Sequence, residues 1–205
     1  MAIEEPDFKI ESKTDHYEIR KYGPVTVAET KIESDFENAG SQAFRILANY
    51  IFGGNKTKTK IEMTAPVTQI AESEKIKMTA PVTQIDGSEK IDMTAPVTQS
   101  KSEAGFLVQF TMPKKFSLNT LPIPNDQRVQ LREIPSRKIA VYTYSGSWSE
   151  SRYQEKLLDF MNILKNDNVK TIGEPVLARF NSPFQLWFLR RNEIWLEISD
   201  LSSKK

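Results

Sequence analysis

Residues 17–54 read YEIRKYGPVTVAETKIESDFENAGSQAFRILANYIFGG. Apolar and polar residues alternate on both sides of Gly23-Pro24, which predicts a strand, a tight turn and a second strand. Ser34 and Glu37 then have the spacing of a capping box, in which side chains bind the free N–H groups at a helix start. The apolar residues that follow recur on one side of a helix, and Gly53-Gly54 is expected to end it. This stretch therefore predicts two strands followed by an amphipathic helix.

The second half of the chain repeats this order. Residues 129–144, VQLREIPSRKIAVYTY, predict a strand, a proline-containing turn and a strand. Ser147 and Glu150 again have capping-box spacing, and a broad apolar helix face follows them. Two further strands are predicted over residues 174–180 and 192–198. The correspondence favours an internal duplication, although any α+β protein can contain two such units.

These elements predict the fold class. We expect an α+β fold, in which a distorted β-barrel of two pseudo-symmetric strand–helix–strand halves is flanked by two α-helices. The sheet is expected to be mixed or antiparallel. The 205 residues are enough to enclose one large core. A cleft is expected where the two halves meet, and such junctions are common places for ligand sites.

The segment MTAPVTQ occurs three times at a spacing of fifteen residues, within residues 61–69, 76–84 and 91–99. In an extended copy, alternate side chains share one face. The proline cannot donate a ladder hydrogen bond, so each copy is expected at a sheet edge or beside a bulge. Near-identity of the copies indicates a recent duplication. One or two copies are expected in the sheet, with the first at the edge of a pocket and the others in a connection between the halves.

The composition excludes several kinds of site. Lys and Arg total 28 and Asp and Glu total 27, so a net charge of +1 gives no reason to expect nucleic acid or an anionic membrane as a partner. The absence of cysteine excludes disulfides, thiolate metal sites and cysteine nucleophiles. No apolar run reaches the roughly 20 residues of a membrane span, and the acidic, polar start does not read as a signal peptide. The cytoplasm is the expected location.

Motifs of hydrolytic enzymes are also missing. The sequence contains no G-x-S-x-G, no H-E-x-x-H and no P-loop, and one histidine cannot supply a pair of metal-binding imidazoles. Catalysis is therefore not expected, although the many Asp and Glu residues leave a pair of catalytic carboxylates open.

Several segments, in a consistent order, resemble the SOUL haem-binding protein family. They are YEIRKYGPVTVAE, FGGNKTKTKIEMTAPVTQ, FLVQFTMPKKF, LPIPNDQRVQLREIPSRKIAVYTYSG, ARFNSPF and FLRRNEIWLEI. The most specific stretches are KIEMTAPVT and RRNEIW. The resemblance extends from Tyr17 to Ile198. It divides the chain into an N-terminal extension, residues 1–16, and one domain, residues 17–199, with a repeat insertion over residues 70–100.

This resemblance implies non-covalent binding of haem or a related tetrapyrrole, as a carrier or buffer, in a shallow apolar cleft beside the first helix. It adds no catalytic residue. At the level of fold the chain also resembles gyrase-inhibitor-like effector-binding domains, and a shared fold does not identify a ligand. The alternative is a sensor or enzyme domain that binds another amphipathic small molecule in the same cleft. A third hypothesis is an interaction module whose edge-like strands pair with a partner strand.

The candidate tetrapyrrole contacts combine the first helix, a methionine of the first repeat copy, and an aromatic loop. The candidates are Phe44, Leu47, Tyr50, Ile51, Met63, Phe184, Trp187 and Phe188, with Arg179 as a partner for a propionate. Further cations that we considered for the propionates are Lys56, Lys58, Lys60, Arg190 and Arg191. Packing of the aromatic loop over the end of the barrel is an equally good interpretation of its sequence.

No metal ligand is predicted. Haem iron accepts His, Met, Cys or Tyr as an axial ligand. The single histidine, His16, directly precedes the first strand and is expected to face solvent. Met63, Met78 and Met93 occupy the same position in the three copies and are expected to pack rather than bind metal. Haem would then be held by apolar contact and by pairing of its propionates.

Overall fold

The computed structural model describes residues 3–57, 87–103, 105–181 and 185–199. Its elements in chain order are β1 (Phe8–Lys13), β2 (Glu18–Tyr22), β3 (Val25–Ile32), α1 (Phe36–Ile51), β4 (Asn55–Lys56), β5 (Val97–Ser102), β6 (Gly105–Thr111), β7 (Ile123–Pro124), β8 (Gln130–Ile134), β9 (Arg137–Tyr144), α2 (Glu150–Asn166), β10 (Thr171–Arg179), the 3-10 helix η1 (Trp187–Leu189) and β11 (Asn192–Ile198). One nine-stranded sheet has the order β1-β2-β9-β11-β10-β5-β6-β3-β8, and β4 pairs with β7 separately.

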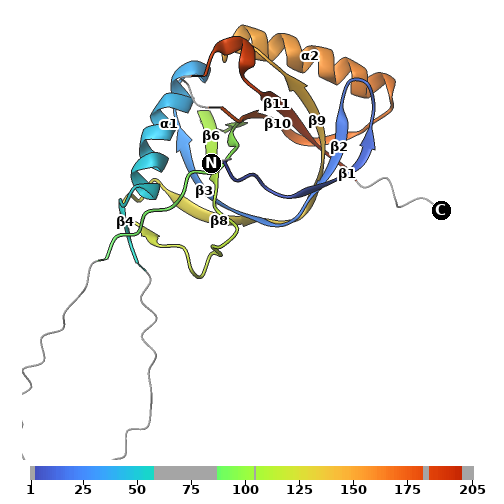
Figure 1. Cartoon of the computed structure of the whole chain (residues 1–205). Helices are drawn as coiled ribbons and strands as arrows, with labels where there is room; N and C mark the ends of the chain where they lie inside the picture. Colours follow the sequence, from blue (N-terminus) through green and yellow to red (C-terminus); the bar gives the residue numbers. More distant parts are fainter. Residues whose placement is uncertain (1–2, 58–86, 104, 182–184, 200–205) are drawn as a thin grey trace, which may run out of the picture.

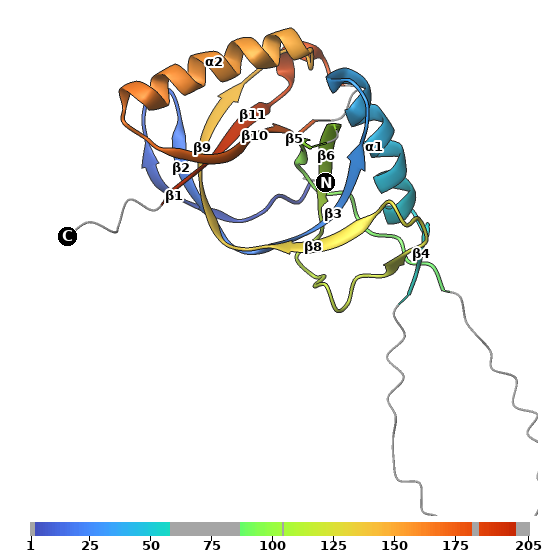
Figure 2. The same ribbon diagram turned by 180° about the vertical axis from the view of Figure 1, so that it is seen from behind.

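The large sheet is antiparallel throughout and curls into a half-barrel. Helices α1 and α2 lie against its outer face, and the N-terminal segment crosses its inner side (Figures 1 and 2). The predicted α+β class, with two helices flanking a barrel-like sheet, is confirmed. None of the helices in the described ranges is long and apolar enough to cross a membrane.

The two halves of the chain have equivalent places in the sheet. Apart from β1 at one edge, the sheet divides into two groups of four strands. From the outside to the centre, one group has the order β2, β9, β11, β10 and the other has the order β8, β3, β6, β5. β2 pairs with β9, and β8 pairs with β3, so each half supplies a strand to the other. The turn at Gly23-Pro24 therefore joins two strands that do not pair with each other. The pseudo-twofold axis passes through the central pair, β5 and β10.

Both helices begin where the sequence predicts them, but with different caps. The N-cap of α1 is Asp35, whose carboxylate accepts a hydrogen bond from the backbone N–H of Asn38 at 2.8 Å. Ser34 instead accepts a hydrogen bond from the side chain of Gln42. In α2 the N-cap is Ser149, and its side chain makes no capping hydrogen bond. Both predicted capping boxes are wrong, because S-D-F-E and S-W-S-E each offer a second capping residue one or two positions later.

The third repeat copy is the one that the structure places in the sheet. Its last residues form the start of β5, a central strand rather than the predicted edge. Pro96 precedes the strand, so its missing N–H breaks no ladder bond. The alternation predicted for the whole copy also fails, because Met93 is 38% exposed. The first two copies lie outside the described residues. Because the three segments are identical, the sequence alone does not indicate which copy enters the sheet. The third copy forms the start of β5, which pairs with β6 directly after it.

Residues that the sequence assigned to an N-terminal extension take part in the same sheet. β1 pairs with β2 along its length, although every side chain of β1 is exposed. Further upstream, Glu4 forms a β-bridge with Thr94 of the third copy. Phe8 and Ile10 alternate with Lys9 and Glu11, so the sequence contains a short strand pattern here that the prediction missed.

Asn55 joins the two ends of the connection that carries the other copies. Its side-chain amide donates to the carbonyls of Tyr50, at 2.7 Å, and Glu89, at 2.8 Å. Its side-chain oxygen accepts from the Glu89 N–H at 2.9 Å. Thr57 N–H also donates to the carbonyl of Gly87 at 2.8 Å. The chain is thus closed between Thr57 and Gly87 by contacts that do not involve the residues between them.

Deletion of residues 60–85 is expected to leave the fold intact, because these contacts and all of β5 remain. The free energy of unfolding should stay equal or rise, since a shorter connection costs less closure entropy. Urea unfolding of the two chains tests this. As a control, Asn55→Ala should lower the free energy of unfolding by about 2–4 kcal/mol in either chain, because it leaves buried backbone groups without partners. An unfolded deletion variant would show that the first two copies stabilise the core.

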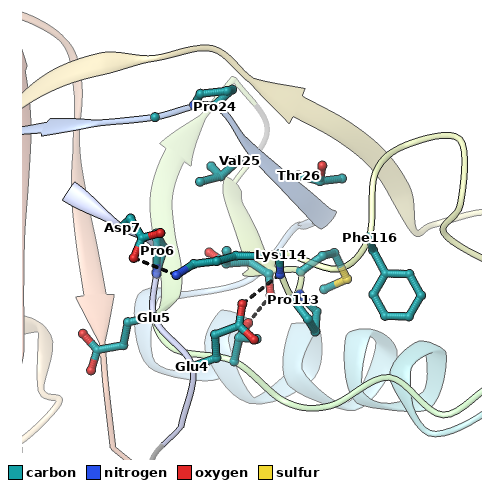
Figure 3. A pocket seen from close by; sticks show the side chains of 14 residues that line it. Glu4, Glu5, Pro6, Asp7, Pro24, Val25, Thr26, Pro113, Lys114 and Phe116 are labelled. Carbon is teal, nitrogen blue, oxygen red and sulfur yellow. Dashed lines mark hydrogen bonds and ion pairs between the residues drawn. The ribbon is translucent and has the colours of Figure 1, made fainter.

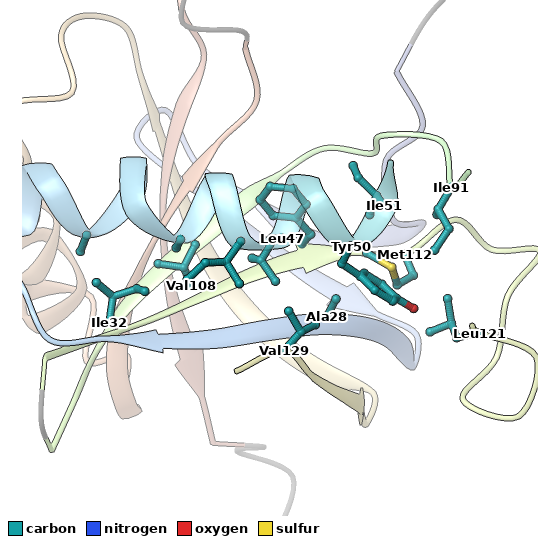
Figure 4. Close-up of a cluster of buried hydrophobic side chains, with 14 residues drawn as sticks. Ala28, Ile32, Leu47, Tyr50, Ile51, Ile91, Val108, Met112, Leu121 and Val129 are labelled. Carbon is teal, nitrogen blue, oxygen red and sulfur yellow. The ribbon is translucent and has the colours of Figure 1, made fainter. Parts of the chain in front are cut away.

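The apolar face of α1 packs into the larger of two cores under the helices. Leu47 and Tyr50 point from this face toward the sheet, as Figure 4 shows, and Ile51 belongs to the same core. They meet side chains such as Ala28 of β3 and Val108 of β6. The opposite half has a matching core between α2 and strands β9, β10 and β11. The side of α1 that faces away from this core remains available to line a site.

Candidate functional site

An open groove of about 830 Å³ lies between the first turns of α1 and the start of α2. Its floor comes from the ends of the two central strands, where Arg179 of β10 and Val97 of β5 are register partners. Its sides include Gly40 and Phe44 of α1, and Trp148 from the loop before α2. The groove therefore lies where the two halves meet.

Gly40 allows α1 to approach the floor of this groove. A Cβ atom at this position would lie 2.5 Å from an Nη atom of Arg179 and 3.2 Å from the side-chain oxygen of Gln99. Gly40 is the fifth residue after the N-cap of α1, and the fifth residue after the N-cap of α2 is Gln154. In the second half Gln154 lines a smaller pocket of about 130 Å³. The larger groove thus lies beside the helix that has glycine at this position.

Arg179 is the most unusual residue of the groove. Its Nε atom is buried and has no hydrogen-bond partner among the described residues. Its guanidinium lies over the rings of Phe36, at 5.9 Å, and Trp148, at 5.3 Å. No carboxylate of the described part of the chain forms an ion pair with it. Burial lowers the pKa of Arg179 to about 10, so that it remains a cation at neutral pH. A buried cation without a counterion is prepared to receive an anionic group.

Trp148 is held firmly at the side of the groove. Its indole Nε1 donates to the side-chain oxygen of Asn192 at 2.8 Å, and Asn192 in turn donates to the carbonyl of Gly146. The guanidinium of Arg190 stacks on the outer side at 4.2 Å from the ring. Phe44 contributes a second, half-buried aromatic ring that packs against Phe110. Together they give the groove aromatic walls above a cationic floor.

The nine residues that the sequence proposes as ligand contacts differ in whether they line the groove. Phe44 and Arg179 line the groove. Leu47, Tyr50 and Ile51 are no more than 1% exposed and belong to the core, so their assignment to the ligand face is wrong. Tyr50 also donates its hydroxyl hydrogen to the carbonyl of Pro122. The helical periodicity identified an apolar stripe correctly, but it did not separate the side that packs from the side that lines the groove.

The aromatic loop follows Asn181, which lines the groove. Trp187 and Phe188 are more than half exposed, which excludes packing of these two rings over the barrel end. The loop is tied to the groove by Arg190, which donates to the Gln185 carbonyl while it stacks on Trp148. Phe184 and Met63 lie outside the described residues, as do Lys58 and Lys60. Lys56 is exposed, and Arg191 pairs with Glu5.

Sequence reasoning did not find Gly40, Trp148 or Val97 as site residues. A tryptophan between two serines, directly before a predicted helix, was the one available signal for Trp148. His16 is exposed, as expected. In the described part of the chain, no group of His, Asp or Glu side chains is arranged to hold a metal ion.

A second pocket, of about 230 Å³, lies beneath the N-terminal segment and is shown in Figure 3. Its carboxylates already have partners. Glu4 accepts a hydrogen bond from the N–H of Lys114 at 2.8 Å, and Asp7 forms an ion pair with the Lys114 ammonium at 2.7 Å. Glu5 pairs with Arg191 at 2.6 Å. These charges fasten the N-terminal segment to the half-barrel, whereas Arg179 has no ion-pair partner among the residues that the structure describes.

A model of the family described as SOUL heme-binding protein matches residues 3–197. The chain belongs to this family. Mouse "Heme-binding protein 2" is 31% identical over 203 residues, covering 96% of this chain and 86% of its own length. The human protein of the same name is 30% identical over the same share of both chains. Membership of the SOUL family supports haem as a candidate cofactor.

Solved structures with little sequence identity share the fold. The C-terminal domain of EcmrR has a TM-score of 0.57 at 10% identity, over 89% of this chain and 98% of that one. A hydrolase from Listeria innocua has a TM-score of 0.53 at 9% identity, over 92% and 94%. These likenesses show that the SOUL chain has a widely used scaffold.

The groove fits a planar, amphipathic anion such as haem. Its volume of about 830 Å³ lies within the range of about 300–1,000 Å³ that is usual for small-molecule sites. Aromatic walls suit the faces of the macrocycle, and Arg179 suits a propionate. None of the described residues that line the groove is a His, Met, Cys or Tyr, the usual axial ligands of haem iron. The described residues thus fit the tetrapyrrole ring and not its metal.

Proposed function

We propose that this SOUL family member binds haem or a related tetrapyrrole non-covalently in the groove between α1 and the start of α2, as a carrier or buffer. The observation that carries this proposal is the guanidinium of Arg179 on the floor of an aromatic groove, with a buried Nε atom and no hydrogen-bond or ion-pair partner among the described residues. A carboxylate placed beside Arg179 would supply the counterion that the described residues do not provide.

The proposed binding mode assigns each contact a role. Phe44 and Trp148 hold the faces of the ring by apolar contact. Arg179 orients the ring by binding a propionate, and exposed Arg45 at the groove is available for the other propionate. Trp187 and Phe188 remain outer candidates, because their loop is anchored to the groove through Arg190. We also propose a cytoplasmic location, since a chain without cysteine gains nothing from an oxidising compartment.

Titration of the purified protein with haemin and with iron-free protoporphyrin tests this function. Both ligands should bind saturably, with one-to-one stoichiometry and similar affinity, because the ring and the propionates provide the contacts and the iron does not. Quenching of tryptophan fluorescence should accompany binding, since Trp148 lies in the groove.

His16→Ala is the matched control for axial ligation. This exposed residue lies away from the groove, so its removal should leave both affinities unchanged. If haemin bound but protoporphyrin did not, the iron-independent mode would be wrong. If neither bound saturably, the proposal of a tetrapyrrole carrier would be refuted.

A further inference from the structure

The turn around η1 presents four consecutive large apolar side chains to solvent. Leu186, Trp187, Phe188 and Leu189 are 58%, 59%, 52% and 57% exposed. The turn is closed by a hydrogen bond from the Leu189 N–H to the Leu186 carbonyl at 2.9 Å. Trp187 and Phe188 pack edge to face against each other rather than against the core. A contiguous exposed apolar patch of this kind marks a surface that is covered in use.

The shape of this apolar turn (Leu186–Leu189) favours a soft, extended partner. It is a short turn in the connection between β10 and β11, with four consecutive large apolar side chains that are each more than half exposed. Trp and Phe on such a turn are the residues that enter the interfacial region of a bilayer most readily.

The charge next to the turn also favours a lipid surface as the partner. The segment from Ala178 to Arg191, ARFNSPFQLWFLRR, contains three arginines and no carboxylate, but Arg179 lines the groove and Arg191 pairs with Glu5. Arg190 is fixed at the base of the turn by its contacts with Trp148 and the Gln185 carbonyl. A turn of large apolar side chains with a cation at its base matches an apolar layer under anionic headgroups. The whole-chain charge of +1 conceals this local arrangement.

We propose that the apolar turn docks the protein reversibly on a lipid bilayer that contains anionic lipids. The turn enters the interface, while Arg190 remains at the level of the headgroups. Because the base of the turn contacts Trp148, docking would bring the groove close to the lipid surface. The docking itself does not depend on a ligand in the groove.

Vesicle sedimentation without any tetrapyrrole tests this inference. The full chain should sediment with vesicles of phosphatidylcholine and phosphatidylserine, and less with phosphatidylcholine alone. Trp187→Ser combined with Phe188→Ser should weaken binding by about tenfold or more, because most of the apolar area that enters the lipid is lost. Both residues are more than half exposed, so the unfolding transition of this variant should stay unchanged.

Helix α2 offers a matched control. Leu158 and Met161 are 63% and 48% exposed, and they belong to α2 rather than to the turn. Leu158→Ser combined with Met161→Ser removes a similar exposed apolar pair and should not change vesicle binding. Equal loss in both double variants would show general stickiness and overturn the proposal.

Two other outcomes would also overturn it. One is the absence of vesicle binding by the full chain. The other is a concentration-dependent dimer that disappears in the Trp187/Phe188 variant, because the turn would then cover a second copy of the chain. Tetrapyrrole binding is measured in buffer without lipid, so failure of the carrier proposal and failure of membrane docking remain distinguishable.

Discussion

Replacement of Arg20 by Leu should lower the free energy of unfolding by about 3–5 kcal/mol, the usual cost of removing one partner of a buried ion pair. Arg20 on β2 and Glu193 on β11 are 8% and 1% exposed. One Nη atom of Arg20 lies 3.1 Å from each oxygen of the Glu193 carboxylate. Without Arg20, this carboxylate is left in the interior with too few partners.

The remaining contacts of Glu193 explain why the loss should be large but not total. Trp195 still donates its indole N–H to the carboxylate at 2.7 Å, and Arg191 lies 3.6 Å away. Arg20 also binds Glu18 and Tyr22, so its removal affects both neighbouring residues of β2. Thermal and urea unfolding of Arg20→Leu would measure the cost.

The pseudo-symmetry of the fold supplies a matched control. Arg132 on β8 takes the place of Arg20 in the other half, and it pairs with Glu29 at 2.9 Å. The side chain of Arg132 is 49% exposed and Gln109 still donates to Glu29 at 2.7 Å, so Arg132→Leu should cost less than Arg20→Leu. Arg20→Leu combined with Glu193→Leu should be less destabilising than Arg20→Leu alone, because no buried charge then lacks a partner. Equal costs for Arg20→Leu and Arg132→Leu would contradict this account.

Local sequence patterns predicted many of the strands and helices of the fold. The alternation around Gly23-Pro24 and the one-sided spacing behind Asp35 predicted two strands and α1 in the right places. The pairing of these strands could not be predicted in the same way. β3 pairs with β8, more than a hundred residues later, and such a partner is chosen by tertiary packing. The three identical repeat copies were indistinguishable for the same reason.

The candidate site was predictable in part. The position of the cleft followed from the junction of two halves, and Phe44 and Arg179 were named among its residues. Leu47 was wrongly assigned to the groove. Phe44, three positions earlier on the same helix, lines the groove, whereas Leu47 packs into the core. The role of Gly40 depends on its distance from Arg179, which is a relation between distant segments. The isolation of the Arg179 guanidinium is likewise a property of the folded chain.

Arg179→Leu should lower the affinity for haemin and protoporphyrin about ten- to hundredfold, which is the cost of one lost hydrogen-bonded pair with a charged group. The same change should leave the free energy of unfolding equal or raise it, because Arg179 is a buried cation without a partner among the described residues. Loss of binding without loss of stability separates a ligand contact from a structural residue. Arg137→Leu is the control, since burial also lowers the pKa of Arg137 but this residue lies outside the groove.

The pH dependence of binding gives a second, independent measure of Arg179. Burial lowers its pKa to about 10, so the guanidinium is a cation below this pH and loses its proton above it. A bound propionate favours the cation, and the affinity for protoporphyrin should therefore fall as the pH rises through about 10. Fluorescence titrations at increasing pH should show this fall in the native chain and in Arg137→Leu. Arg179→Leu should lose this component of the pH dependence, and an identical fall in that variant would place the propionate elsewhere.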